Sequence, residues 1–307
     1  MSYLNESIKL SIVIPLYNGR DHISTCLKSL ELALSDLSYE IIIVDNGSTD
    51  GGIELIKQSF PCVKVICNKE NRYFARANNQ GFAIASGNFI VTLNSDTEII
   101  ESPFEFLMEF MEKNLDTGIT SCPLYFLDER LQPTRRRRKT WKAFLLEFTP
   151  FYLFLRIKSM ENYLKKLYYE NDKGLPAGPQ DVEVLQGALL MIKKETLSFL
   201  GGFDETFRLS FTDDELCIRC GRLGYRVVFI PEGKVLHHER VSQNRVSLVE
   251  FIHWSDYFYY IRKYMGGWPS LFFFYPLYIL GRFFRWVFIK FGIIDHLRRK
   301  KSDFIDN

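Results

Sequence analysis

The sequence predicts an α/β protein built on a mixed, mainly parallel sheet with helices on both faces. The first observation is that apolar, β-branched runs alternate with segments of helical periodicity between residues 8 and 93. The second is that these runs are apolar at nearly every position, which is typical of strands buried on both faces. The third is a composition of 47% hydrophobic and 25% charged residues over 307 residues, ordinary for a globular protein of one large or two joined domains.

The most regular elements lie in the first third of the chain. The predicted strands are residues 8–16, 39–44, 63–67 and 88–93, and the predicted helices are residues 21–34, 51–60, 72–85 and 103–114. Regularity is lost over residues 124–179. A strand-like run at 182–192, a helix at 216–223 and a strand at 226–230 follow.

Charge and cysteine content exclude several classes of protein. A net charge of +2 is too balanced for a dedicated nucleic-acid binder, so no nucleic-acid partner is expected. Cys217 and Cys220 form a single Cys-x-x-Cys pair, which is short of the four ligands of a structural zinc site. The N-terminal residues lack the pattern of a secretory signal peptide, so a cytoplasmic location is expected.

Polar side chains follow three of the predicted strands. They are Asn18, Asp45 and Asp96. Because ligands of parallel α/β sheets bind at the carboxyl ends of the strands, these three positions predict a ligand site at one sheet edge.

Residues 11–18 (SIVIPLYN), 41–51 (IIIVDNGSTDG), 94–96 (NSD) and a later acidic cluster at 213–215, in this order, resemble glycosyltransferase family 2. The resemblance covers about residues 10–242 and implies an inverting, nucleotide-sugar-dependent enzyme of the GT-A fold. Residues 71–96 are similar to the rhamnosyltransferase-like branch. The sequence departs from that branch at Tyr73, where Gly is usual, and at Ser95, where Pro is usual. These departures put the identity of the donor sugar in doubt more than the activity.

The resemblance assigns roles to individual residues. Asp96 stands at the metal-binding position and implies Mg²⁺ or Mn²⁺, and register with the F-E-D-x-D-L-C-x-R motif places the catalytic base on Asp213, with Thr212 where Glu is usual. Asp214 or Glu215 takes the role of the base if the register slips. The residues implied around the nucleotide sugar are Pro15, Tyr17, Asn18, Asp45, Asn71, Arg76, Asn94 and His237.

Each motif also has a purely structural interpretation. Asp45 and Asp96 are suited to strand-to-helix turns and helix caps, and residues 213–215 to favourable charges at a helix N-terminus. Gly187, in a Gln-Gly-Ala segment that resembles the acceptor-side strand of the family, is suited to a β-bulge. The basic run 135–139 is suited to a solvated or lipid-facing surface, such as one against an anionic membrane, or to substrate contact.

The C-terminal segment combines aromatic and basic residues. Residues 268–307 carry seven Lys or Arg and three Asp, a net charge of +4, with a 14-residue uncharged stretch at 268–281. We expect a helical tail on an anionic membrane surface, with Pro269 and Pro276 weakening an uninterrupted helix. A helix that packs on the catalytic core and a true membrane span are the alternatives.

Together these patterns predict a donor-binding half at residues 1–115, an acceptor-binding and base half at 116–253, and a membrane-apposed tail at 254–307. The expected partners are a nucleoside diphosphate sugar, a glycan or lipid-linked glycan acceptor and the inner face of the cell membrane. The expected reaction moves a sugar, rhamnose or another hexose, to a hydroxyl of a cell-surface polysaccharide or lipid-linked glycan. An inactive nucleotide-binding scaffold and a sugar nucleotidyltransferase are the alternatives. A nucleotidyltransferase would carry a Gly-rich phosphate loop after the first strand, and this sequence lacks that loop.

Overall fold

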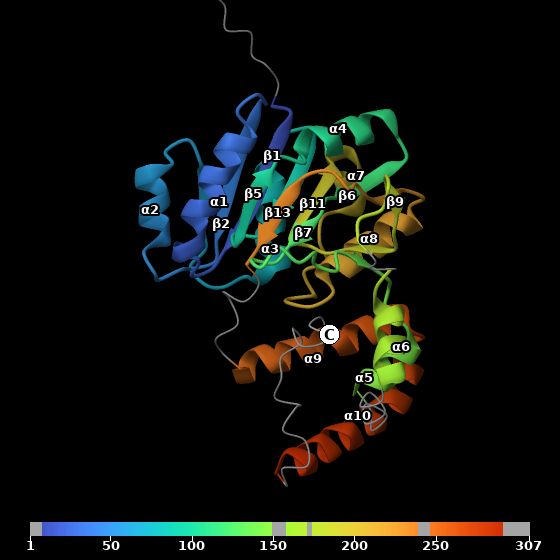
Figure 1. Ribbon diagram of the computed structural model, residues 1–307. Helices are drawn as coiled ribbons and strands as arrows, with labels where there is room; N and C mark the ends of the chain where they lie inside the picture. The colour runs from blue at the N-terminus through green and yellow to red at the C-terminus, as the bar shows by residue number, and fades with distance from the viewer. Residues whose placement is uncertain (1–7, 149–157, 171–173, 239–245, 291–307) are drawn as a thin grey trace, which may run out of the picture. The chain divides into compact units, whose positions relative to one another are not determined.

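The computed structural model describes residues 8–148, 158–170, 174–238 and 246–290 (Figure 1). Packing divides the chain into two compact units. The first comprises Met1–Arg138 and Tyr169–Tyr259, and the second comprises Lys139–Tyr168 and Tyr260–Asn307.

An eight-stranded sheet forms the centre of the first unit (Figure 1). In spatial order its strands are β3 (Lys64–Cys67), β2 (Tyr39–Asp45), β1 (Leu10–Leu16), β4 (Phe89–Leu93), β11 (Leu189–Lys193), β6 (Thr117–Ser121), β12 (Arg226–Phe229) and β9 (Gln180–Asp181). Strands β3, β2, β1 and β4 run parallel, whereas β11 is antiparallel to both of its neighbours. The predicted α/β class with a mainly parallel sheet is therefore confirmed.

Helices cover the two faces of this sheet, and β1 shows why its residues are apolar throughout. Ile12 and Ile14 pack in the core on the face covered by α1 (Arg20–Ala33), α2 (Gly52–Ser59) and α4 (Phe104–Lys113). Val13 points to the opposite core, under α3 (Tyr73–Ile84), α7 (Lys194–Leu200) and α8 (Thr212–Arg222). Successive strand residues face opposite sides, so a strand covered on both faces needs apolar side chains at every position.

Two small sheets lie beside the main one. One joins β5 (Thr97–Glu101), β13 (Lys234–His237) and β7 (Leu124–Tyr125), and the other joins β10 (Val184–Leu185) and β8 (Arg135–Arg136). The single strand-like run predicted at residues 182–192 is therefore wrong. β10 and β11 belong to different sheets, because the chain leaves one ladder at Gln186–Ala188 and joins another.

The acidic cluster at residues 213–215 lies on a longer helix than the sequence predicted. α8 begins at Thr212, not at residue 216, so all three acids lie in its first turn. Acidic side chains there are stabilised by the unpaired N–H groups of the helix end. Helix α9 (Val246–Tyr264) follows, and most of its length belongs to the first unit.

The second unit consists of α5 (Trp141–Phe148), α6 (Lys158–Tyr168), the end of α9 and α10 (Gly267–Lys290). Phe144 stacks on Tyr260 and meets Phe274 edge-on, and the Trp141 indole donates a hydrogen bond to the carbonyl of Met265 at 3.1 Å. α10 continues for 24 residues through Pro276, so the weakening expected from this proline does not end the helix. Pro269 lies in the first turn, where its missing N–H costs no helical hydrogen bond.

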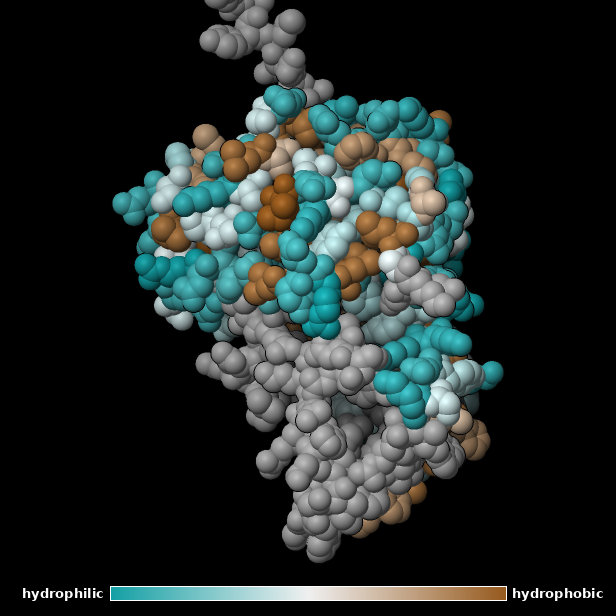
Figure 2. Space-filling view, in the orientation of Figure 1, coloured by the Kyte–Doolittle hydropathy of each residue, from teal (hydrophilic) through white to brown (hydrophobic). Residues whose placement is uncertain are grey.

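Apolar side chains reach the surface along α10 (Figure 2). They are Trp268, Phe272, Phe273, Tyr275, Ile279, Leu280 and Phe283. None of the helices in the described parts of the chain combines the length and apolar character that crossing a membrane requires.

Candidate active site

The loops after β1 and β2 form one connected polar edge. The backbone N–H of Asn18 donates to Ser48 Oγ at 2.9 Å, and Asn18 Oδ1 accepts the N–H of Thr49 at 2.9 Å. Pro15 is the last but one residue of β1 and lies opposite Val44. Leu16 ends β1 opposite Asp45, the last residue of β2, and Tyr17 follows. Asn18 therefore holds the two strand-end loops together, as expected for neighbouring parallel strands.

Asp45 is buried at the end of β2, and its carboxylate accepts the N–H of Ser48 at 3.1 Å. This contact closes a turn. It does not cap α2, whose N-cap is Gly51 with no side-chain cap bond. The helix-cap interpretation of Asp45 is thus not what the structure shows, and the carboxylate stays at the sheet edge.

The start of α3 shows why glycine is usual at position 73 in the branch pattern. Tyr73 stands where Gly is usual and has a φ of +63°, a left-handed conformation that glycine adopts without strain. Asn71 Oδ1 accepts the N–H of Tyr73 at 2.8 Å and so stabilises this turn. Arg76, further along α3, pairs with Glu205 at 3.4 Å, with both side chains about half exposed.

Three predicted residues meet just after β4, namely the neighbours Asn94 and Asp96 and the distant His237. His237 Nε2 lies 3.4 Å from Asp96 Oδ1 and 3.2 Å from Asn94 Nδ2. His237 is the last residue of β13, which pairs with β5 so that His237 lies opposite Thr97. Burial alone would raise the pKa of Asp96, but the hydrogen bond and charge of His237 lower it.

Gln132 orients this histidine and was missed by sequence reasoning. Its Nε2 donates to the carbonyl of His237 at 2.9 Å, so its Oε1 is the atom 3.0 Å from His237 Nδ1. Nδ1 therefore donates its hydrogen to Gln132 Oε1, and this contact turns Nε2 toward Asp96. The only signal in the sequence was the position of Gln132 inside the loop 128–136, beside the basic run.

The donor set suits a hard divalent cation that is completed by a substrate. Within the described residues no group of three or more His, Cys, Asp or Glu side chains could hold a metal. Asp96 supplies one carboxylate and His237 one imidazole, and Mg²⁺ and Mn²⁺ commonly take their remaining ligands from water and phosphate oxygens. The residues present therefore fit Mg²⁺ or Mn²⁺ together with a diphosphate.

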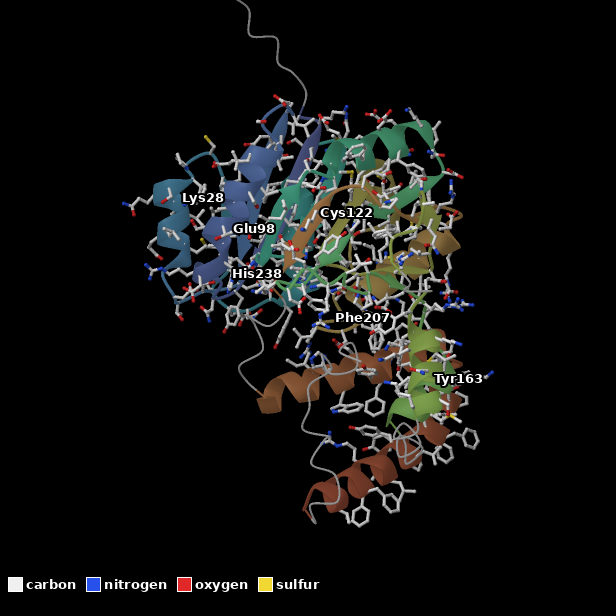
Figure 3. All side chains as sticks on the ribbon, viewed as in Figure 1. Lys28, Glu98, Cys122, Tyr163, Phe207 and His238 are labelled. Carbon is white, nitrogen blue, oxygen red and sulfur yellow. The ribbon has the colours of Figure 1, made fainter. Side chains whose placement is uncertain are left out.

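A second histidine lies next to this centre. The backbone N–H of His238 donates to the carbonyl of Asp96 at 2.9 Å, and the His238 ring meets the ring of His22 edge-on. Its Nε2 is 3.9 Å from Glu98 (Figure 3). His238 thus faces α1 and β5 through its side chain, whereas His237 faces Asp96.

The first turn of α8 distinguishes the three candidate bases. Glu215 is fully buried and pairs with Arg219 through two contacts of 2.7 Å, so it is committed to a salt bridge. The side chain of Asp213 is more exposed than those of Asp214 and Glu215, at 15% against 5% and 0%. Accessibility therefore favours Asp213 among the three.

Asp213 packs directly on Gly187. Its Oδ2 accepts the N–H of Gly187 at 2.8 Å, and a Cβ at residue 187 would lie 3.0 Å from the Asp213 Cβ. The glycine is needed because this chain's own carboxylate approaches the backbone there. On the other side of the same short segment, Asn94 donates its N–H to the carbonyl of Ala188 at 2.9 Å. Gly187 and Ala188 therefore connect Asp213 to Asn94, which lies beside Asp96 and His237.

The basic run 135–139 divides into different environments. Arg135 is buried, donates to Gln180 and to the carbonyl of Gly174, and lies over the ring of Phe229. Arg136 contacts Asp213, and Arg137 pairs with Glu170. A uniformly solvated or lipid-facing run is therefore wrong, because the first residues of the run are tied into the fold.

Comparisons with known proteins identify the class. Residues 11–170 match the family model described as Glycosyl transferase family 2, and this chain belongs to that family. It is 24% identical over 279 residues to the N-acetylglucosaminyl-diphospho-decaprenol L-rhamnosyltransferase of Mycobacterium tuberculosis, covering 85% of this chain and 87% of the relative. It is also 33% identical over 145 residues to the uncharacterized glycosyltransferase YibD of Escherichia coli, covering 45% of this chain and only 42% of that protein.

Solved structures show the same fold. The mannosyltransferase PcManGT of Pyrobaculum calidifontis, solved in complex with GDP-Man and Mn²⁺, superposes with a TM-score of 0.53 at 18% identity, covering 87% of this chain and 68% of that chain. The chain is therefore a glycosyltransferase of the GT-A fold. The family match supports a glycosyltransferase over the two alternative interpretations of the sequence, an inactive nucleotide-binding scaffold and a sugar nucleotidyltransferase.

Proposed function

We propose that this glycosyltransferase moves a hexose such as rhamnose, with inversion, from a nucleoside diphosphate sugar to a hydroxyl of a cell-surface polysaccharide or lipid-linked glycan. The observation that carries the proposal is the junction at residues 187–188, which connects Asp213 to Asn94 beside Asp96 and His237. An inverting transfer needs an acceptor-side base and a phosphate-side centre close together. The relative from M. tuberculosis, by its name a rhamnosyltransferase, supports the choice of sugar and of a lipid-linked acceptor.

The donor half, residues 1–115, would bind the nucleotide at the linked loops of β1 and β2. In this assignment Pro15, Tyr17, Asn18 and Asp45 surround the base and ribose, and the carboxylate of Asp45 accepts an N–H of the base. Asn71 and Arg76, at and beyond the start of α3, and Asn94 and His237 then lie toward the ribose and diphosphate.

Asp96 and His237 would hold Mg²⁺ or Mn²⁺ beneath the diphosphate. A bound cation of this kind offsets the negative charge that develops on a departing diphosphate. Asn94 and Gln132 keep the imidazole of His237 in its orientation, so that Nε2 faces the diphosphate side.

The acceptor half, residues 116–253, would supply the base. Asp213 takes the proton of the acceptor hydroxyl while the oxygen attacks the anomeric carbon from the face opposite the diphosphate. Single displacement on that face inverts the configuration of the sugar.

A panel of nucleoside diphosphate sugars tests this function. The enzyme is incubated with each donor and a lipid-linked glycan, with and without Mn²⁺, and release of the nucleoside diphosphate is measured. We expect release with one class of donor, dependence on the cation and an inverted linkage in the product by NMR. A product that retains the donor configuration would contradict the role of Asp213 as a simple base.

We also propose that the tail, residues 254–307, rests on the cytoplasmic face of the cell membrane. Among the side chains of α10 that the structure describes, seven large apolar ones are exposed, three of them at 70% or more (Trp268, Phe272 and Phe273). Residues 268–307 carry a net charge of +4. Aromatic rings favour the bilayer interface, and each basic residue near an anionic leaflet contributes about 1 kcal/mol. Docking there would bring a lipid-linked acceptor to the enzyme.

Vesicle co-sedimentation tests the docking. The full chain should bind vesicles rich in phosphatidylglycerol, and 1 M salt should weaken the binding on the order of tenfold. The double variant Phe272→Ser/Phe273→Ser should lose binding, whereas Phe199→Ser, which removes a 63% exposed phenylalanine from α7, should keep it. Equal binding of all three proteins would refute docking through α10.

A further inference from the structure

Arg136 contacts the carboxylate assigned as the base. Its Nη2 donates to Oδ2 of Asp213 and lies 3.8 Å from Oδ2 of Asp214. The same nitrogen lies 3.5 Å from the carbonyl of Leu185, the residue of β10 that pairs with Arg135 of β8. The guanidinium is thus placed by a two-stranded ladder against the first turn of α8.

Arg136 brings a positive charge to two neighbouring aspartates. Asp213 and Asp214 are adjacent, and their side chains are only 15% and 5% exposed. Like charges this close and this poorly hydrated repel each other. A single guanidinium between them reduces the net charge of the group from −2 to −1.

Arg136 also decides which oxygen of Asp213 is available. Oδ2 accepts two donors, the Arg136 guanidinium and the Gly187 N–H at 2.8 Å. Among the described residues, Oδ1 has no hydrogen-bond donor. The carboxylate is therefore held on one side and open on the other.

We propose that Arg136 is a positioning residue. With the N–H of Gly187 it fixes Oδ2 of Asp213 so that Oδ1 receives the acceptor proton, and it supplies a positive charge that Asp213 and Asp214 share. This inference rests on the proposed function of Asp213 as the base. It assigns a task to an arginine whose run in the sequence indicated only substrate or membrane contact.

Arg136 keeps this role throughout the proposed reaction. The acceptor O–H bond breaks and its proton goes to Oδ1 of Asp213. The acceptor oxygen bonds to the anomeric carbon, and the bond from that carbon to the diphosphate oxygen breaks. Asp213 is then neutral, and the Arg136 guanidinium still faces a carboxylate, that of Asp214. The cation therefore has an anionic neighbour before and after proton transfer.

The experiment compares Arg136→Gln and Arg136→Lys with a matched control, Arg226→Gln. Arg226 also lies between two aspartates, 2.8 Å from Asp181 and 3.7 Å from Asp116, but at the amino end of β12. We expect Arg136→Gln to lower kcat on the order of 100-fold with the donor KM within about twofold of the wild-type value. Arg136→Lys should recover part of kcat, because it restores the charge but not the fixed geometry. Arg226→Gln should keep the wild-type kcat.

A double variant separates counter-charge from simple packing. Asp214→Asn in the Arg136→Gln background returns the net charge of the group to −1, so kcat should rise about threefold or more above that of Arg136→Gln. Thermal unfolding and donor binding verify that each variant folds. A wild-type kcat for Arg136→Gln, or a double variant slower than Arg136→Gln, would overturn the inference.

Failure of the base assignment looks different. If Asp213→Asn keeps activity, Asp213 is not the base and the proposed function fails in that respect. If Asp213→Asn is inactive and Arg136→Gln is not impaired, the base stands and only the role of Arg136 is refuted.

Discussion

Replacement of Gly187 by alanine tests the contact on which the acceptor side depends. The new Cβ would lie 3.0 Å from the Cβ, 3.3 Å from Oδ2 and 3.4 Å from Cγ of Asp213. Ordinary van der Waals contact begins near 3.4 Å, so the Asp213 side chain must move by a few tenths of an ångström. The backbone itself is not strained by alanine, because Gly187 is not among the residues with positive φ.

The consequence for catalysis should exceed the consequence for stability. Asp213 is partly exposed and can yield, so we expect unfolding free energy to fall by about 1 kcal/mol, the low end for overpacking. The shift lengthens the hydrogen bond from the Gly187 N–H, now 2.8 Å, and moves Oδ1 away from the acceptor. A displacement of about 1 Å can lower the rate on the order of 100-fold, so a displacement of about half that size predicts a loss in kcat of about tenfold.

The assay measures kcat and KM for donor and acceptor in Gly187→Ala, with chemical unfolding as the stability measurement. The matched control is Gly221→Ala in α8, where an added Cβ meets nothing within 4 Å. That control should keep the wild-type kcat and gain about 0.5–1 kcal/mol of stability from improved helix propensity. A wild-type kcat for Gly187→Ala would refute the argument that Asp213 must approach the backbone closely.

Three further predictions follow from the described contacts. Asp213→Asn should lower kcat by about 10²–10⁴ with donor binding retained by calorimetry, and Asp214→Asn should lower it far less; the reverse order would move the base to Asp214. Asp96→Ala should abolish the stimulation of turnover by Mn²⁺ while the circular dichroism spectrum is kept; undiminished stimulation would refute the metal assignment. Burial of Glu40 would raise its pKa, but hydrogen bonds from Lys64, the Ser11 hydroxyl and the Ser86 N–H together lower it. The pKa of Glu40 is lower in the folded than in the unfolded protein. The ionised Glu40 therefore stabilises the fold at a pH above its unfolded-state pKa, and this stabilisation is lost as the pH falls through its folded-state pKa. In Glu40→Gln the free energy of unfolding, measured with urea, should therefore fall less steeply as the pH is lowered. A pH dependence equal to that of the wild type would contradict this.

The local pattern of the sequence determined the donor side of the fold. Residues 8–16 and 39–44 are apolar at nearly every position, and they form β1 and β2 with cores on both faces. Because neighbouring parallel strands end at the same edge, the sequence also placed Asn18 near the loop after Asp45. Periodicity and turn chemistry are properties of a few consecutive residues, so they can be read without knowledge of the rest of the chain.

Pairing between distant segments was decided only by the tertiary structure. β6 and β5 went unpredicted because their residues, such as Thr117 and Glu98, do not form an apolar run, and their strand conformation depends on partners elsewhere. α10 passes through Pro276 although local propensity opposes it. In each case the neighbours that complete the hydrogen bonds or cover the side chains are remote in sequence.

The same distinction holds within the candidate site. The sequence selected Asp96, His237 and Asp213 from motifs, but it could not show that Gln132 orients His237, 105 positions away, or that Arg136 reaches Asp213, 77 positions away. A hydrogen bond requires two groups within a few tenths of an ångström of their ideal separation. That precision comes from the ladders that fix β8, β10 and β13, and these ladders exist only when the whole chain has folded.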